Sequence, residues 1–213
     1  MLTCLGLFIG EGSSDDPLAR LVSDAFILRG VDADIRSLGA DRLGAEGKDI
    51  PTKIRTAKKL FSDFDFVVIH RDCDNQEPHV RIEEISSAVE ETLGADFPTI
   101  EVVPRTMTEA WLLLNESAIR KVAGKPNSRK SLDLPKPKNV EGVRDPKKML
   151  EEAILTASDE SGRRRQKISG KFSSHRRNLL EQLDPDMLAG LPSWQHTIQC
   201  IDRYVGHLSG QAS

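Results

Sequence analysis

The chain has 213 residues, of which 38% are hydrophobic and 30% are charged, a composition typical of a globular protein with one or two domains. The 30 Lys and Arg residues nearly balance the 33 Asp and Glu residues, so the net charge of −3 favours no class of partner. No apolar run approaches the ~20 residues that a membrane-spanning helix needs, so we expect no membrane partner.

Three cysteines, Cys4, Cys73 and Cys200, lie far apart in the sequence and form no Cys-x-x-Cys pair. This spacing argues against a disulfide framework and against a structural zinc site, and it fits a reducing cytoplasm. The apolar segment 1–10 has no basic residue and is followed at once by Glu11, so it predicts a strand and not a signal peptide.

Residues 1–115 alternate between short apolar runs and segments with helical spacing. Strands are expected at 2–9, 31–38, 64–70 and 99–104. Helices are expected at 17–30, 50–61, 80–93 and 108–114, with a glycine- and charge-rich loop at 39–49. This alternation predicts an α/β domain whose mostly parallel sheet is flanked by helices on both faces.

After residue 115 the composition changes. Residues 116–144 form a connection rich in Pro and Lys, which is typical of an extended segment. Residues 145–213 contain further helical patterns. We therefore expect a C-terminal helical extension that packs on the 1–115 domain instead of standing alone.

Acidic side chains follow two of the expected strands. Asp72 and Asp74 come after the third strand, and Glu11 lies between two glycines after the first. Side chains two residues apart on an extended backbone point the same way, and the carboxyl ends of parallel strands meet at the ligand-binding edge of an open sheet. We therefore expect three carboxylates to meet there. Carboxylates this close repel one another unless a proton or a cation intervenes, and oxygen ligands suit Mg²⁺ or Mn²⁺.

A strand followed by Glu11 and Gly12 and then a helix, with a later apolar strand that ends in Asp72-x-Asp74, resembles the Toprim domain. That domain occurs in primases, topoisomerases and the overcoming-lysogenisation-defect nucleases. The resemblance implies a Toprim-like fold in which Glu11, Asp72 and Asp74 act as catalytic and metal-binding residues in Mg²⁺-dependent phosphoryl transfer.

Two further segments extend the resemblance: Thr-Glu-Ala-Trp-Leu-Leu at 108–113 and Asp-Pro-Lys-Lys at 145–148. They resemble an uncharacterised, Toprim-like bacterial family whose members are similar to partners of ATPases in phage-defence gene pairs. The chain differs from the Toprim pattern at 13–16, where Ser-Ser-Asp-Asp replaces the usual Thr-Glu or Lys-Asp-like pairs. The chain has no ATP-binding P-loop motif, so any ATP dependence would come from a partner protein.

Other charged residues are candidates for the same site. Glu109, just inside a helix start, either completes the acidic catalytic site or only complements the positive end of the helix. Basic residues cluster in the C-terminal part, where they predict either a nucleic-acid-binding surface or a solvated face. These candidates are Lys147, Arg163, Arg164, Arg165, Lys167, Lys171, Arg176 and Arg177. Lys147 and Lys148 are also candidates for stabilising charge in the transition state.

The leading expectation is a metal-dependent nuclease that hydrolyses phosphodiester bonds, with Glu11 as a metal ligand or as the general base. The alternative is a non-catalytic, Toprim-like binding or regulatory subunit of an ATPase-containing complex. A haloacid-dehalogenase-type phosphatase would use Asp72 as nucleophile, but there the motif normally follows the first strand. A topoisomerase-like route needs a tyrosine, and the only one is Tyr204. His70 and His175 are further acid/base candidates.

Overall fold

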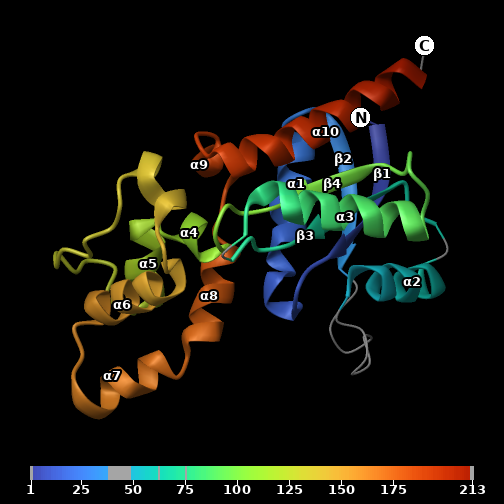
Figure 1. Cartoon of the computed structure of the whole chain (residues 1–213). Helices are drawn as coiled ribbons and strands as arrows, with labels where there is room; N and C mark the ends of the chain where they lie inside the picture. Colours follow the sequence, from blue (N-terminus) through green and yellow to red (C-terminus); the bar gives the residue numbers. More distant parts are fainter. Residues whose placement is uncertain (1, 38–48, 62, 75, 212–213) are drawn as a thin grey trace.

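The computed structural model describes residues 2–37, 49–61, 63–74 and 76–211 (Figure 1). Its strands are β1 (Leu2–Ile9), β2 (Val31–Ser37), β3 (Phe66–His70) and β4 (Thr99–Val102). They pair in the order β2-β1-β3-β4, and every pair is parallel. The predicted α/β fold with a parallel sheet is confirmed. The loop expected at 39–49 lies, except for its last residue, outside the described residues.

Helices cover the sheet and extend beyond it to one side (Figure 1). They are α1 (Pro17–Ile27), α2 (Ile50–Leu60), α3 (Pro78–Thr92), α4 (Glu109–Leu112), α5 (Glu116–Val122), α6 (Pro146–Ser158), α7 (Gly162–Ser169), α8 (Phe172–Leu180), α9 (Pro185–Leu188) and α10 (Pro192–Gln211). The described residues also include the 3₁₀ turns η1 (Ser13–Asp15) and η3 (Pro137–Gly142). The connection expected at 116–144 thus contains a helix, α5, and the turn η3.

Alternate side chains of the strands fill two different cores. Phe8, Phe66 and Val68 belong to a core that includes residues of α1 and α10, whereas Leu7 and Val67 belong to a core with residues of α2 and α3. Because the central strands β1 and β3 are buried on both faces, their sequences are apolar at successive positions, whereas the edge strand β2 alternates buried and exposed residues. This burial is what made β1 and β3 recognisable as central strands.

The last helix of the chain returns to the sheet. Gly6 in β1 leaves room for the ring of Phe66, which a Cβ at position 6 would approach to 2.4 Å. That ring packs on Phe26 of α1 and on Tyr204 of α10, with centroid separations of 5.1 and 5.0 Å. Helix α10 also packs on β4. One face of the sheet is therefore covered by the first and the last helix together.

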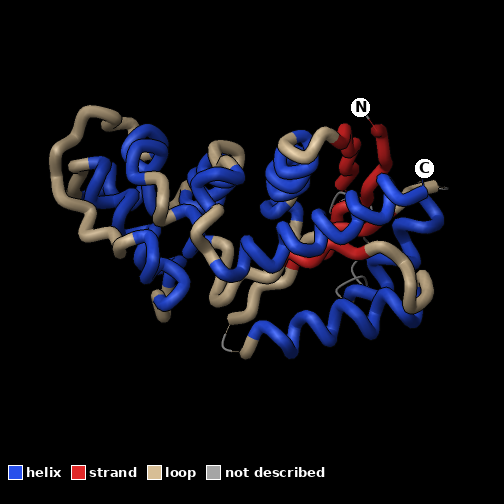
Figure 2. The backbone as a smooth tube through the Cα atoms, turned by 90° about the horizontal axis from the view of Figure 1, so that it is seen from above, coloured by secondary structure: helices blue, strands red, loops and turns tan. Residues whose placement is uncertain are grey.

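Helices α4 to α8 form a helical lobe beside the sheet, and the molecule is elongated along this direction (Figure 2). The lobe shares its core with the α1/α10 face of the sheet, since Trp111 of α4 packs edge-on against Trp194 of α10 with a centroid separation of 5.7 Å. Within the described ranges no helix is both long enough and apolar enough to cross a membrane.

The segment that follows β3 connects the sheet to the lobe. After His70 the chain still pairs with the continuation of β4, through hydrogen bonds from the Arg71 N–H to the Val102 carbonyl (3.1 Å) and from the Asp74 N–H to the Thr106 carbonyl (2.8 Å). Helix α4 begins only three residues after Thr106. The carboxyl edge of the sheet, where β1 and β3 end side by side, therefore faces groups from the lobe.

Candidate acidic site at the carboxyl edge of the sheet

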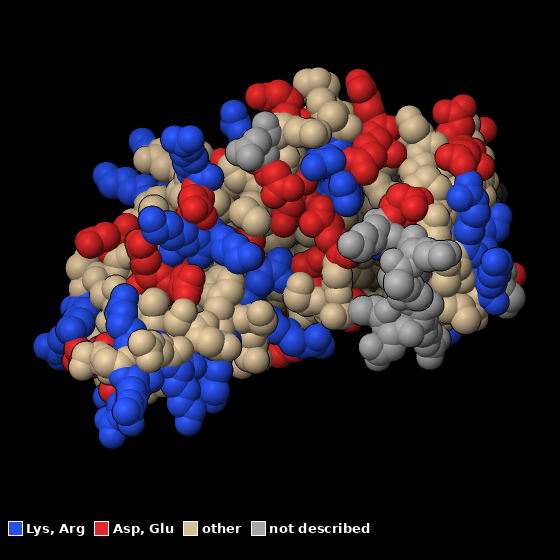
Figure 3. All heavy atoms as spheres, turned by 60° about the horizontal axis from the view of Figure 1, so that its bottom comes forward, with Lys and Arg blue, Asp and Glu red and all other residues tan. Residues whose placement is uncertain are grey.

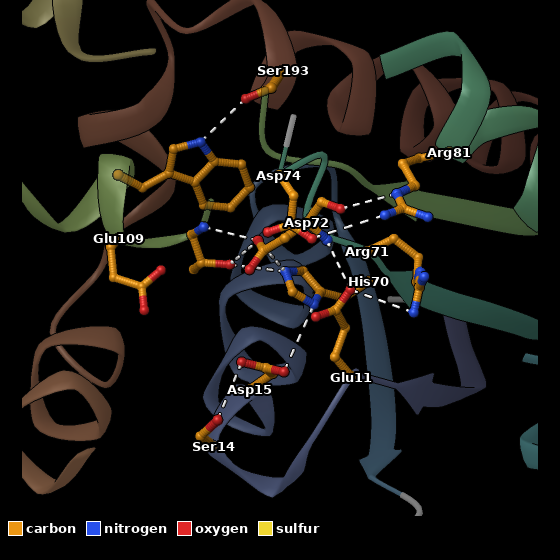
Figure 4. Close-up of polar contacts among 12 residues, drawn as sticks. Glu11, Ser14, Asp15, His70, Arg71, Asp72, Asp74, Arg81, Glu109 and Ser193 are labelled. Carbon is orange, nitrogen blue, oxygen red and sulfur yellow. Dashed lines mark hydrogen bonds and ion pairs between the residues drawn. The ribbon is translucent and has the colours of Figure 1, made fainter. Parts of the chain in front are cut away.

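Glu11 and Asp72 lie close together where β1 and β3 end (Figure 4). The Glu11 Oε1 accepts a hydrogen bond from the backbone N–H of Asp72 at 3.2 Å. Lys53 of α2 holds the turn that carries Glu11, because its Nζ donates to the carbonyl oxygens of Gly10 (2.7 Å) and Glu11 (2.9 Å). The structure thus brings together two of the three carboxylates that the sequence predicted to meet.

Asp72 is fixed by three groups around its Oδ1. The backbone N–H and the hydroxyl of Thr108 donate to this oxygen at 2.8 and 2.9 Å, and His70 Nε2 lies 3.3 Å away. Because the Thr108 hydroxyl gives its proton to Asp72, its oxygen accepts from His70 Nε2, at 2.8 Å. The other ring nitrogen of His70, Nδ1, lies 3.8 Å from Asp15 Oδ2 and is buried without a hydrogen-bond partner. The imidazole therefore lies between two carboxylates.

These contacts set the charges of the site. Burial alone would lower the pKa of His70, but the hydrogen bond and the negative charge of Asp72 raise it above its ordinary value. Burial would likewise raise the pKa of Asp72, but His70 and Thr108 hold it below its ordinary value. Burial, followed by the charge of Asp72, raises the pKa of Glu11. Asp72 is thus the anion that the protein stabilises, and Glu11 is the carboxylate that gains most from a proton or a cation.

Arg176 of α8 links two carboxylates from distant parts of the chain. Its Nε lies 2.8 Å from Glu109 Oε1 and its Nη2 lies 2.9 Å from Asp15 Oδ1. The Arg176 side chain is only 10% exposed, and both carboxylates are buried. Asp15 in addition accepts from the backbone N–H of Gly12 at 3.0 Å, which shapes the turn after Glu11. Asp15 was not predicted as a site residue, although it lies only four residues after Glu11.

Asp74 does not join Glu11 and Asp72, so the expectation that the two aspartates point the same way is not met. The backbone of Asp74 is left-handed (φ 53°), which ends the extended conformation on which that expectation depended. Its carboxylate is half-exposed and lies 3.8 Å from Arg81 Nη2 (Figure 4). Asp74 lines a neighbouring hollow of about 460 Å³ together with Lys148.

A pocket of about 250 Å³ lies between the sheet edge and the lobe. Six ionisable side chains line it: Glu11, Asp15, Asp72, Glu109, Lys147 and Arg176. Within the described residues, the hydrogen bonds to the Asp72 carboxylate all reach Oδ1, Glu11 Oε1 also lies 3.4 Å from Arg71 Nη1, and Glu109 Oε2 is buried without a hydrogen-bond partner. Free carboxylate oxygens are the ligands that Mg²⁺ prefers, so the residues present fit one hard divalent cation.

The predicted basic residues separate into two groups. Lys147 is exposed and lines the pocket, Arg177 is exposed on α8, and Lys171 is exposed just before α8. The three arginines and the lysine of α7 are exposed as well. Arg176 corrects the prediction, because its buried ion pairs remove it from any exposed basic surface. Figure 3 shows Lys and Arg side chains gathered over the lobe and Asp and Glu side chains gathered where the lobe meets the sheet.

The remaining candidates lie away from the acidic pocket. Tyr204 is buried on α10 against Phe66, and burial raises its pKa, so it is not placed as a nucleophile for this site. Burial and the charge of Lys171 lower the pKa of His175, and His175 does not line the pocket.

A scan against family models and searches of curated proteins and of solved structures gave no match. The Toprim resemblance therefore stays a prediction that rests on the short motifs around Glu11, Asp72 and Asp74.

Proposed function

We propose that the acidic pocket hydrolyses phosphodiester bonds of a nucleic acid with Mg²⁺ or Mn²⁺, as a Toprim-like nuclease would. The observation that carries the proposal is the meeting of Glu11 and Asp72 in one pocket with Asp15, Glu109 and Lys147. A cation held by Glu11 and Asp72 would activate water and offset the charge that builds on the phosphate. The motifs at 108–113 and 145–148 support an ATPase partner in phage defence as part of the same proposal.

The protein groups around the pocket have separate tasks in this proposal. Thr108 and His70 keep Asp72 ionised and fix its orientation, which leaves Asp72 Oδ2 as its ligand atom. Lys147 is exposed at the rim and offers a positive charge to a phosphate oxygen. Arg176 neutralises Asp15 and Glu109, so these two acids add little repulsion against an approaching phosphate.

The exposed basic side chains of α7 supply the second half of the proposed interface. Three consecutive arginines begin this helix, and all of them are exposed. Arg164 has an ion pair with Glu160, but it is 81% exposed and stays accessible to a larger anion. Such residues contact phosphates without reading bases, so we expect binding that weakens steeply with salt.

A second candidate function is a non-catalytic subunit with the same fold. The observation that favours it is the Arg176 bridge, because a buried arginine satisfies Asp15 and Glu109 without any metal. In that case the carboxylates would serve to dock the lobe on the sheet edge.

Cleavage of labelled single- and double-stranded DNA and RNA with Mg²⁺, Mn²⁺ or chelator tests the proposal. Asp72→Asn keeps an oxygen for the two Thr108 donors but removes the negative charge. Glu11→Gln likewise keeps a side-chain oxygen at position 11 and removes its negative charge. Each should lower the cleavage rate at least about a hundredfold, since metal-held charge stabilises the transition state by several kcal/mol. Circular dichroism and thermal unfolding check that the fold is kept.

Asp74→Asn is the matched control, because it makes the same chemical change two residues away and outside the pocket. Its effect should stay below about tenfold. Equal losses in Asp72→Asn and Asp74→Asn would contradict the assignment of the site to Glu11 and Asp72. Absence of metal-dependent cleavage of all four substrates would overturn the nuclease proposal in favour of the non-catalytic subunit.

A further inference from the structure

A second cluster of ligand-type side chains lies on the edge strand of the sheet. It consists of Glu101 of β4 with His196 and Cys200 of α10, whose ligand atoms all lie within 4.8 Å of one another. Among the described residues, no other set of three His, Cys, Asp or Glu side chains meets this closely. Figure 1 shows α10 running across the sheet, and the cluster lies away from the acidic pocket, whose lining contains none of the three.

The three side chains converge on one point instead of forming a relay. Glu101 Oε2 lies 2.6 Å from His196 Nε2, and Cys200 Sγ lies 3.9 Å from that same nitrogen and 3.9 Å from Glu101 Oε2. In a Cys-His-acid nucleophile arrangement, the thiol and the acid contact different nitrogens of the imidazole. Here both contact Nε2, which argues against an activated cysteine and for a shared central partner.

The cluster is carried by two regular elements that are fixed to each other. His196 and Cys200 are four residues apart on α10, so they lie on one face of the helix. Between them, the Thr197 hydroxyl donates a hydrogen bond of 2.8 Å to the carbonyl oxygen of Glu101, and this bond holds α10 against β4. The positions of the three ligand atoms are therefore set by backbone packing and not by a loop.

We propose that Glu101, His196 and Cys200 form a binding site for a borderline divalent cation of the Zn²⁺ type. A thiolate, an imidazole nitrogen and a carboxylate oxygen are the three ligand types that Zn²⁺ takes in proteins. Ligand atoms around a tetrahedral zinc ion lie about 3.3–3.6 Å apart. Both sulfur separations exceed this range by only a few tenths of an ångström, and the closer oxygen–nitrogen pair is held by a hydrogen bond that a cation would replace.

The fourth coordination position is open to a pocket. Glu101 and Cys200 line a cavity of about 490 Å³, with Arg203 and Tyr204 also in its wall. Three protein ligands with one accessible position is the arrangement of zinc sites that bind water or a small ligand, whereas structural zinc sites are closed by four protein ligands. The site therefore differs from the structural zinc motif that the cysteine spacing argued against.

Titration of the metal-free full-length chain with Co²⁺, and then displacement by Zn²⁺, tests this site. Of the Co²⁺ that binds, we expect one ion per chain to give a sulfur-to-cobalt charge-transfer absorption, which only a thiolate ligand gives. Cys200→Ser should abolish this absorption and weaken Zn²⁺ binding at least about a hundredfold, because a direct ligand is worth more than the 10–100-fold of a supporting residue. Cys73→Ser is the control, since Cys73 lies beside the acidic pocket, the other place where Co²⁺ can bind.

The outcomes separate cleanly. Absorption that is lost in Cys200→Ser and kept in Cys73→Ser supports the site. Absence of the charge-transfer band in the wild type, or a band that survives Cys200→Ser, overturns it. If Cys200→Ser does not fold, His196→Gln gives the same decision, because it should keep the sulfur band but weaken Zn²⁺ binding, and unchanged affinity would contradict the proposal.

Discussion

The acidic pocket and the Glu101 cluster both gather ionisable side chains, but they differ in what satisfies the charges. In the acidic pocket, protein donors already surround the carboxylates: Thr108 and His70 serve Asp72, and Arg176 serves Asp15 and Glu109. In the cluster, Glu101, His196 and Cys200 contact mainly one another.

The two regions therefore depend on an outside cation to different degrees. A carboxylate with its own donors keeps its geometry when no metal is bound, so the acidic pocket is organised by the protein. Three ligands that share one point need a proton or a metal between them. The cluster should therefore change more with pH and with chelators than the acidic pocket does.

The largest expected effect concerns Arg176, which tests whether protein cations organise the acidic pocket. Arg176→Met leaves the buried carboxylates of Asp15 and Glu109 without their cation, so the free energy of unfolding in urea should fall by about 3–5 kcal/mol. Arg177→Met is the matched control, because the half-exposed Arg177 side chain pairs with Glu181, which is also half-exposed, and its loss should cost about 0–1 kcal/mol. Equal small losses would show that the buried bridge does not hold the lobe to the sheet.

An intermediate effect is expected at Thr108. Thr108→Val keeps the shape of the side chain but removes the hydroxyl between Asp72 and His70, and leaving these buried groups unsatisfied should cost about 1–3 kcal/mol in unfolding free energy. Thr108→Ser restores the hydroxyl and should recover most of the loss. If the serine variant is no more stable than the valine variant, the hydroxyl is not what fixes Asp72.

A change with pH, and not a fixed loss of stability, is expected at the cluster without metal. Hydrogen bonds to Cys200 and Glu101 raise the pKa of His196 to about 10. Between the ordinary pKa of 6.5 and the folded-state pKa of about 10, the folded state holds a proton on His196 that the unfolded state has lost. The stabilisation by protonated His196 is therefore complete below about pH 6.5 and disappears as the pH approaches 10. With chelator present, the stability difference between wild type and His196→Gln should shrink over this range. A difference that stays constant from pH 6.5 to 10 would contradict the raised pKa.

The central strands were predictable because a strand that is buried on both faces has a continuous apolar run in its sequence. The apolar runs at β1 and β3 predicted the strands, and the order of elements predicted that Glu11 and Asp72 would meet. Asp74 was not predictable in this way, since the chain turns to a left-handed conformation at that residue and the two-residue periodicity of a strand no longer applies.

Contacts between distant segments were not predictable from local sequence patterns. Arg176 is part of a basic run and shows no sign that it alone is buried, 161 residues after Asp15. The Glu101 cluster joins residues 95 positions apart, and its only local signal is the four-residue spacing of His196 and Cys200 on one helix. The packing of α8 buries Arg176, and the packing of α10 forms the Glu101 cluster. The periodicity of the sequence predicts helices and strands but not how they pack.

The position of α10 has a consequence for biosynthesis. Phe26 and Phe66 pack against Tyr204, so the part of the sheet face that α10 covers stays open to water until residues 192–211 have left the ribosome. A nascent chain that stops before this helix would expose an apolar surface to chaperones and to other chains. Completion of this face should therefore wait until α10 has been synthesised, although β1 to β4 are complete by residue 102.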